Sequence, residues 1–256
     1  YRGLSLLKRK LIDRYRIWGL KKADGIIFEN NLLELKCHEI FKVKAITTTI
    51  KPSINLNYKS REYILPKLII NKTTFKGLFL CCWHLNKNVM LIPEIAYHLK
   101  MQNIDFHFIL TAPCDNSSIY QEFNSLVDKF NVKDMISIIG TVKKEELNSL
   151  YNQIDFVFLL SKLESFSNNI IEAWSFKRVL VISDEPWARA LCGDGAVYVN
   201  RESPKTIAEM IVRIINIPDL HKYSIENGYQ NLKEYPKIEE RVNQEISFIK
   251  KIYEKI

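Results

Sequence analysis

The sequence predicts an α/β protein built on a doubly wound parallel sheet, with part of a second domain in front of it. Two observations predict this fold. From Phe75 onward, short runs rich in Ile, Val, Leu and Phe alternate with segments of helical period, as strands and crossover helices do in a parallel sheet. The strand-like runs are also apolar throughout, which is typical of strands buried on both faces.

The part of the chain before Phe75 shows fewer regular elements. Strands are predicted at 25–29 and 44–49, with a helix at 30–41 between them. Residues 50–74 contain Pro52, Pro66 and many polar residues, which indicates a linker.

The first 22 residues carry eight Lys or Arg residues and one acid, interleaved with apolar residues at helical spacing. This pattern predicts a basic amphipathic helix, which can lie on an anionic membrane surface. The alternative is an ordinary surface helix whose apolar stripe packs on a sheet.

The regular part repeats the strand and helix units. Strands are predicted at 77–82, 104–110, 135–139, 154–160 and 179–183, and a short strand at 196–199. Helices are predicted up to 101, where Pro93 implies a kink or a late start, and at 119–130, 144–152, 169–176, 203–215, 218–232 and beyond Pro236. Ligands of such sheets bind beyond the carboxyl ends of the strands.

The loop before the predicted helix at 169–176 is the candidate functional site. Four of its residues are types that start helices: Ser165, Ser167, Asn168 and Asn169. Backbone N–H groups at a helix start point outward with the positive end of the helix dipole, so the loop is suited to a phosphate group.

Two carboxylates, Glu164 and Glu172, flank this loop with seven residues between them. Carboxylates beside a phosphate site are suited to accept hydrogen bonds from neutral hydroxyl groups, such as those of a sugar nucleotide. The alternative is structural: Asn169 caps the helix, Glu172 completes a capping box, and Glu164 is a solvated loop acid.

Composition narrows the class of protein. The net charge of +8 over 256 residues favours anionic partners such as nucleotides, nucleic acid or an acidic membrane. No apolar run approaches the ~18–20 residues that span a bilayer and no signal peptide is visible, so we expect a cytoplasmic protein that can lie peripherally on the inner membrane face. The cysteines include no C-x-x-C pair, and Cys81 and Cys82 are predicted to be core residues of a strand.

Several short motifs accompany the loop in a fixed order. They are Lys21-Lys22-Ala23-Asp24-Gly25-Ile26-Ile27-Phe28, Asn86-Lys87-Asn88, Gly140-Thr141-Val142, Leu150-Tyr151, Ser183-Asp184-Glu185-Pro186-Trp187-Ala188-Arg189 and Cys192-Gly193-Asp194-Gly195-Ala196-Val197-Tyr198. With the two carboxylates, this series resembles the Glu-x7-Glu retaining glycosyltransferases of the GT-B fold, the group 1 or family four type, mainly their C-terminal domain.

The resemblance implies a domain organisation. Residues 1–49 would be the end of the acceptor-binding domain, 50–74 the linker, 75–235 the Rossmann-like nucleotide-sugar-binding domain, and 236–256 a helix that crosses back. The chain begins at Tyr1, and we expect it to be a piece of a longer protein.

The resemblance also assigns roles to residues. Glu172 would bind the ribose hydroxyls, and Lys87 would pair with the diphosphate. Glu164, an acid that has been discussed as catalytic in relatives, would contact the transferred sugar and orient it. The remaining predicted contacts are the diphosphate loop Ser165, Phe166, Ser167, Asn168 and Asn169, and the base contacts Thr141 and Val142. His84 lies close to the position at which relatives often have an arginine, and it could bind the donor in its place. The alternative is that His84 is an ordinary loop residue. Relatives have glycines near Ser165 and Ser167, so this chain departs from them there.

The predicted function is transfer of a sugar from a nucleotide-diphosphate donor to a surface-glycan or lipid-linked acceptor, with retention, as in bacterial polysaccharide or lipopolysaccharide biosynthesis. No Asp-x-Asp metal pair is present, so we expect neither metal nor cofactor. The alternative is a catalytically incomplete nucleotide-sugar-binding module or partner subunit. Epimerases rank lower because they lack this loop, and nucleic-acid binding is not expected because the basic residues gather in the first helix without a recognition motif.

Overall fold

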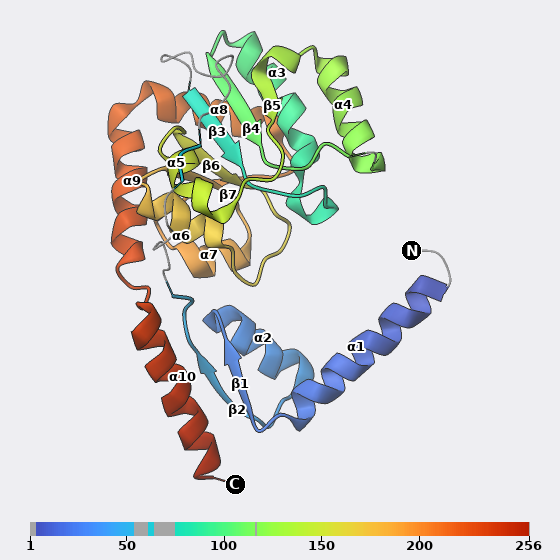
Figure 1. The fold of residues 1–256 in the computed structure, drawn as a ribbon, viewed down its shortest axis with the longest axis vertical. Helices are drawn as coiled ribbons and strands as arrows, with labels where there is room; N and C mark the ends of the chain where they lie inside the picture. Colours follow the sequence, from blue (N-terminus) through green and yellow to red (C-terminus); the bar gives the residue numbers. More distant parts are fainter. Residues whose placement is uncertain (1–3, 54–60, 64–74, 116, 256) are drawn as a thin grey trace. The chain divides into compact units, whose positions relative to one another are not determined.

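The computed structural model describes residues 4–53, 61–63, 75–115 and 117–255 (Figure 1). The chain divides into two compact units. The smaller unit comprises residues 1–54 and 235–256, and the larger comprises residues 55–234. The predicted linker at 50–74 lies mostly outside the described residues.

The larger unit is built on one sheet of parallel strands. In chain order they are β3 (Phe75–Phe79), β4 (Phe106–Leu110), β5 (Ile136–Ile138), β6 (Phe156–Leu159), β7 (Val179–Ser183) and β8 (Val197–Val199). Their spatial order is β5-β4-β3-β6-β7-β8, so the direction of winding reverses between β3 and β6. This confirms the predicted α/β fold with a doubly wound parallel sheet.

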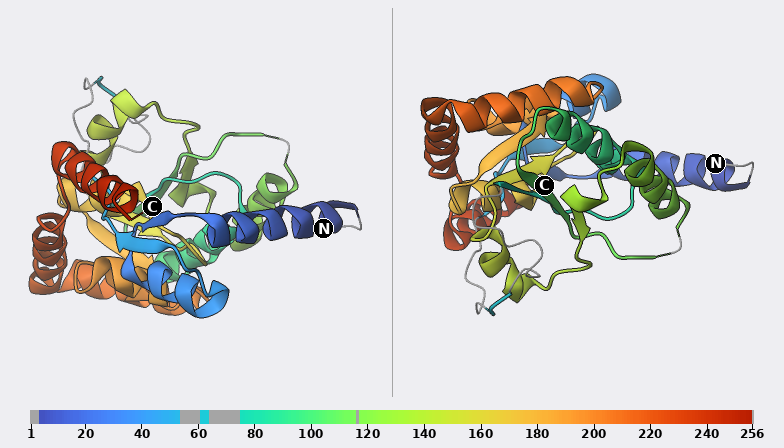
Figure 2. Two further views of the ribbon diagram at one scale, coloured as in Figure 1. Left: turned by 90° about the horizontal axis from the view of Figure 1, so that it is seen from below. Right: turned by 90° about the horizontal axis from the view of Figure 1, so that it is seen from above.

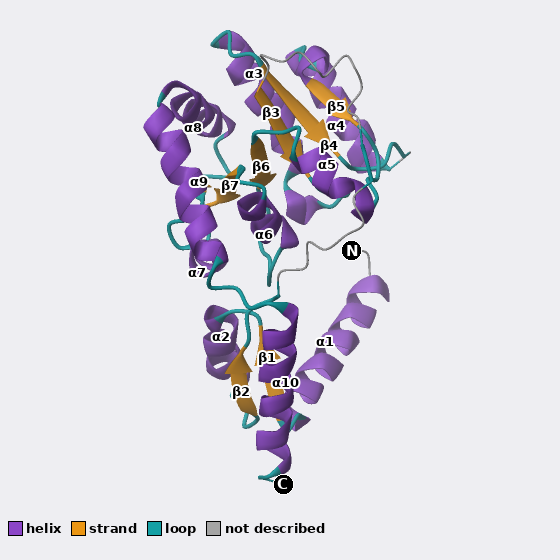
Figure 3. Ribbon diagram, turned by 60° about the vertical axis from the view of Figure 1, so that its left-hand side comes forward, coloured by secondary structure: helices purple, strands orange, loops and turns teal. Residues whose placement is uncertain are grey.

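Helices flank this sheet (Figures 2 and 3). They are α3 (Ile92–Met101), α4 (Ser118–Phe130), α5 (Leu147–Tyr151), α6 (Asn168–Ser175), α7 (Pro186–Cys192), α8 (Pro204–Asn216) and α9 (Pro218–Leu232). Pro93 lies in the first turn of α3, so this proline marks a late helix start and no kink. Helix α7 is absent from the sequence prediction.

Aromatic side chains fill the centre of the core around one glycine of β3. The rings of Phe106, Phe108, Phe156 and Phe158 are buried, with neighbouring centroids 4.8 to 6.4 Å apart. Gly77 lies between the strands that carry these rings. A Cβ atom at position 77 would lie 2.5 Å from the Phe158 ring and 2.8 Å from the Phe106 ring, so only glycine fits without moving them.

Helix α6 is anchored by Trp174, which is almost fully buried. The indole Nε1 donates a hydrogen bond to the Gly195 carbonyl oxygen at 2.7 Å. A Cβ atom at Gly195 would lie 3.0 Å from this indole, and one at Gly228 of α9 would collide with it. Two glycines from distant parts of the chain therefore make room for one ring.

The prediction that Cys81 and Cys82 are core residues of a strand is wrong. Strand β3 ends at Phe79, Cys81 is half-buried and Cys82 is exposed. The backbone N–H of Cys81 donates to the Thr111 hydroxyl at 3.1 Å and no longer to a neighbouring strand. The ladder stops there because a side chain takes the place of a strand partner.

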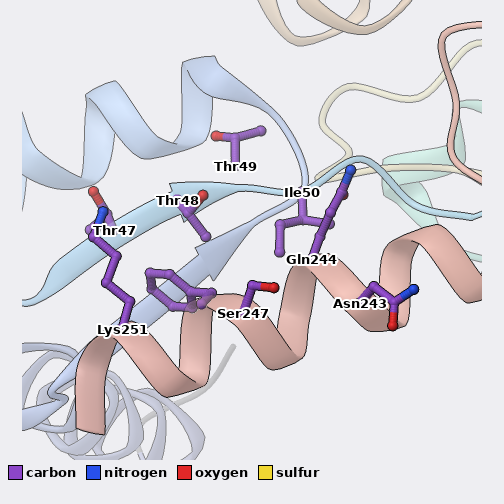
Figure 4. A pocket seen from close by; sticks show the side chains of 9 residues that line it. Thr47, Thr48, Thr49, Ile50, Asn243, Gln244, Ser247 and Lys251 are labelled. Atoms are coloured by element: carbon purple, nitrogen blue, oxygen red, sulfur yellow. The ribbon is translucent and has the colours of Figure 1, made fainter. Parts of the chain in front are cut away.

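The smaller unit contains two parallel strands, β1 (Gly25–Phe28) and β2 (Ile46–Thr49). Its helices are α1 (Leu4–Lys22), α2 (Asn31–Phe41) and α10 (Ile238–Tyr253). A polar groove of about 510 Å³ runs between β2 and α10, lined by residues such as Thr48, Asn243 and Lys251 (Figure 4). Among the described residues, no helix is both long and apolar enough to cross a bilayer.

Candidate active site

A cavity of about 730 Å³ opens beyond the carboxyl ends of β3 and β6, where the strand order reverses. This is the place at which doubly wound sheets bind their ligands. Nine of the predicted site residues line it: Lys87, Thr141, Val142, Glu164, Phe166, Ser167, Asn168, Asn169 and Glu172. Nine residues predicted from separate segments therefore line one cavity, and their roles remain predictions.

Lys87 and Glu164 form an ion pair inside this cavity. Lys87 ends a 3₁₀ turn that follows β3, and Glu164 lies in the loop that follows β6. The Lys87 Nζ atom lies 2.6 Å from Glu164 Oε1, and the two side chains are only 25% and 14% exposed. The alternative that Glu164 is a solvated loop acid is therefore wrong.

Asn86 holds the two loops of this ion pair together. Its amide Nδ2 donates to the Leu163 carbonyl at 2.8 Å, and its Oδ1 accepts from the Leu163 N–H at 3.2 Å. Its backbone carbonyl accepts from the Lys162 N–H at 2.9 Å. Asn86 was not predicted as a site residue, although it precedes Lys87 in one of the motifs.

Glu172 lies on α6 with 8% of its surface exposed. Its Oε2 accepts a hydrogen bond of 2.7 Å from the Tyr151 hydroxyl. Burial raises the pKa of this carboxyl group, against the Tyr151 hydrogen bond and the nearby charge of Lys144. The cavity thus presents one buried carboxylate in addition to the ion pair.

The capping-box interpretation of this loop is wrong. Helix α6 begins at Asn168, its N-cap residue is Ser167, and the Ser167 side chain makes no cap hydrogen bond. The Asn169 amide donates instead to the Leu80 carbonyl at 3.3 Å. Because Asn169 is the second helical residue, it cannot form a box with Glu172.

Serine fits the predicted diphosphate loop without backbone strain. Ser167 has φ −138°, and neither Ser165 nor Ser167 is among the residues with positive φ. The glycines that the family resemblance predicts nearby are therefore not required by the backbone conformation of this loop.

Two predicted residues lie outside the lining of the cavity. Ser165 and His84 are both exposed. The His84 ring accepts a hydrogen bond at Nδ1 from the Asn86 N–H at 3.1 Å and so caps the 3₁₀ turn. Its position supports a structural role, and a role in donor binding remains a prediction.

The comparisons with known proteins fit this geometry. The family model of glycosyl transferases group 1 matches residues 60–231. The chain belongs to this family. A curated relative, the O-antigen chain mannosyltransferase of Salmonella typhimurium, is 23% identical over 249 residues, which are 90% of this chain and 69% of that protein.

Solved structures of glycosyltransferases share the fold. The sucrose-phosphate synthase of Thermosynechococcus elongatus superposes with a TM-score of 0.79 at 17% identity, over 100% of this chain and 67% of that one. HepE of Anabaena, solved with UDP and glucose, gives a TM-score of 0.75 at 13% identity, over 91% of this chain and 64% of that one. The likeness to both structures is one of fold.

In this group 1 glycosyltransferase, the cavity also contains residues that the sequence prediction missed. Lys144 and Thr111 line it, and Tyr151 reaches it through Glu172. Lys144 follows the predicted base contacts by two residues, so its charge was the available signal. Nothing in the sequence indicated that Tyr151 contacts Glu172.

Proposed function

We propose that this glycosyltransferase moves a sugar from a nucleoside-diphosphate donor to a surface-glycan or lipid-linked acceptor, with retention at the anomeric carbon. The observation that carries the proposal is the set of charges facing one cavity: the Lys87 cation for a diphosphate, and Glu164 and Glu172 for sugar hydroxyl groups. The UDP and glucose in HepE support the donor class, and the Salmonella mannosyltransferase supports a surface-glycan acceptor.

Each side chain has a distinct task in this proposal. Glu172 accepts hydrogen bonds from the ribose diol, and Glu164 orients the transferred sugar. Lys87 and the N–H groups at the start of α6 neutralise the diphosphate as it leaves, without a metal ion. The bond between the anomeric carbon and the phosphate oxygen breaks, the acceptor oxygen takes its place, and the acceptor's hydroxyl proton is released.

Replacing Glu172 by alanine tests the ribose contact. We expect donor binding to weaken by about 1–3 kcal/mol, because the buried ribose hydroxyl groups lose their acceptor. Calorimetric titration with UDP, GDP and ADP measures this loss and identifies the base. Glu122→Ala, which changes an exposed acid of α4, is the matched control and should leave affinity unchanged. A folded Glu172→Ala protein with wild-type affinity would contradict the ribose assignment.

The alternative function is donor binding without turnover. Titration of the chain with a sugar nucleotide, followed by addition of an acceptor glycan, separates the two classes. Transfer of the sugar supports the enzyme, whereas saturable binding without transfer supports a binding module or partner subunit.

We also propose that α1 contacts an anionic membrane surface. Leu11, Tyr15 and Trp18 are 58%, 72% and 56% exposed, and basic residues such as Lys10 and Arg14 accompany them on the same helix. Aromatic and basic side chains together favour the interface of anionic lipids. We expect co-sedimentation with vesicles containing phosphatidylserine, and its loss with neutral phosphatidylcholine vesicles or in Trp18→Ala. Equal sedimentation with both lipids would refute this contact.

A further inference from the structure

Tyr151 is a buried residue that touches the candidate site through one atom. It ends α5, has no exposed surface, and stacks on Phe176 with ring centroids 5.1 Å apart and an angle of 11°. Its hydroxyl group donates to Glu172 Oε2 at 2.7 Å. The ring is therefore held by packing, and the hydroxyl group is held by the carboxylate.

The hydrogen bond leaves part of the carboxylate available. A tyrosine hydroxyl group has one hydrogen to donate, and a carboxylate has two oxygens that each accept. With Oε2 bonded to Tyr151, Glu172 keeps Oε1 and the remaining lone pairs for a ligand in the cavity that it lines. A side chain fixed at one oxygen also loses less conformational freedom when the ligand binds.

We propose that Tyr151 is a positioning residue of the donor site. It fixes Glu172 so that the carboxylate accepts hydrogen bonds from both hydroxyl groups of the donor's ribose. This role rests on the proposed function, because it requires a nucleotide in the cavity. It assigns to Tyr151 a part in substrate recognition that is exerted wholly through its neighbour.

The charges around Glu172 give this role a measurable signature. Tyr151 faces the carboxyl group from α5 and Lys144 acts on it from the 3₁₀ turn Lys144–Glu146, while the Lys87–Glu164 ion pair lines the same cavity. Burial raises the pKa of Glu172, and the Tyr151 hydrogen bond is the larger of the two effects that oppose it. Burial also holds the pKa of Tyr151 well above its usual value, so this hydroxyl group stays a donor.

The pKa shift of Glu172 determines how nucleotide affinity depends on pH. The ionised carboxylate is the form that accepts two hydrogen bonds, so nucleotide affinity falls as the pH falls through the pKa of Glu172. Without the Tyr151 hydroxyl group, burial is less opposed and this pKa rises further. The affinity of a Tyr151→Phe protein is therefore lost at a higher pH than that of the wild type.

The test is calorimetric titration with the nucleoside diphosphate that the wild-type protein binds, repeated between about pH 5 and pH 8. Tyr151→Phe keeps the ring and its stacking, and we expect affinity near pH 7 to fall about three- to tenfold with the midpoint of the pH profile shifted upward. Tyr198→Phe is the matched control, because that hydroxyl group bonds the Gly193 carbonyl at 2.6 Å and Tyr198 does not line the cavity.

A second measurement does not depend on the ligand. Carbon-detected NMR follows the Glu172 carboxyl group in the free protein, with Glu172→Gln to assign its resonance, and the pKa should be higher in Tyr151→Phe. If the affinity of Tyr151→Phe changes while neither the midpoint of its affinity–pH profile nor the NMR pKa of Glu172 moves, the packing is damaged. That result overturns the role of Tyr151. Absence of nucleotide binding by the wild-type protein at every pH overturns the proposed function itself.

Discussion

Replacing Lys87 by methionine is expected to weaken the binding of a nucleoside diphosphate about 10- to 100-fold and to leave the binding of the nucleoside nearly unchanged. Methionine matches the length of the apolar stem of lysine but lacks the ammonium group. The variant loses a hydrogen bond to a charged group, which contributes about 1.5–3 kcal/mol. Turnover of the donor should fall further, by about 10²- to 10³-fold, because charge develops on the leaving diphosphate.

The comparison of the two ligands makes this prediction specific. Of the two ligands, only the diphosphate is expected to contact Lys87. A variant that lost affinity for both the diphosphate and the nucleoside would therefore have a damaged site. Lys100→Met is the matched control, since Lys100 also pairs with a carboxylate, Asp134, at 3.0 Å but lies outside the cavity lining. Equal affinity of wild type and Lys87→Met for the diphosphate would remove Lys87 from the donor site.

Replacing Glu164 by glutamine should strengthen the binding of two ligands to unequal extents. Glu164 Oε1 lies 2.6 Å from Lys87 Nζ, so an incoming diphosphate must compete with Glu164 for the same ammonium group. Glutamine removes the charge that competes and that repels the phosphates, and we expect a nucleoside diphosphate to bind about three- to tenfold more tightly. The sugar nucleotide should gain much less, because its hexose loses a charged acceptor, and turnover should fall by about 10²-fold.

The matched control is another partly buried ion pair of the same unit. Glu185 pairs with Arg201 at 2.7 Å, with side chains 26% and 22% exposed, and Glu185 does not line the cavity. Glu185→Gln should change neither affinity. If Glu164→Gln weakened the diphosphate and the sugar nucleotide alike, Glu164 would support the site structurally and would not compete for Lys87.

The sheet was predictable because each strand has a local signal in the sequence, a short apolar run. The apolar runs at 154–160 and 179–183 contain β6 and β7, and alternation with helices fixes a parallel sheet. The strand ends were less predictable. An apolar run through Cys82 suggested a longer strand, yet β3 ends at Phe79 because Thr111, 32 residues further on, bonds the backbone beyond it. Pro186 signalled the start of α7, but that helix has only seven residues.

Most residues that line the cavity were predicted from the sequence, but the contacts between them were not. The motif around Glu164 and Glu172 predicted a loop that lines the cavity, and the family resemblance predicted Lys87, which lines it too. The ion pair joins residues 77 positions apart, and Tyr151 lies 21 positions from the carboxylate it contacts. Such partners depend on side-chain direction after folding, which residue type and spacing along the chain do not record.

The indole of Trp174 restricts which residues positions 195 and 228 can accept. While that ring is present, a side chain at Gly228 collides with it and one at Gly195 crowds it as well as the Asn231 amide. A smaller residue at position 174 would have to appear before position 228 could accept a side chain, and it would forfeit the hydrogen bond to Gly195. Substitutions at these sites are therefore ordered in time: an exchange harmful in this chain becomes acceptable only in a descendant that has already lost the tryptophan.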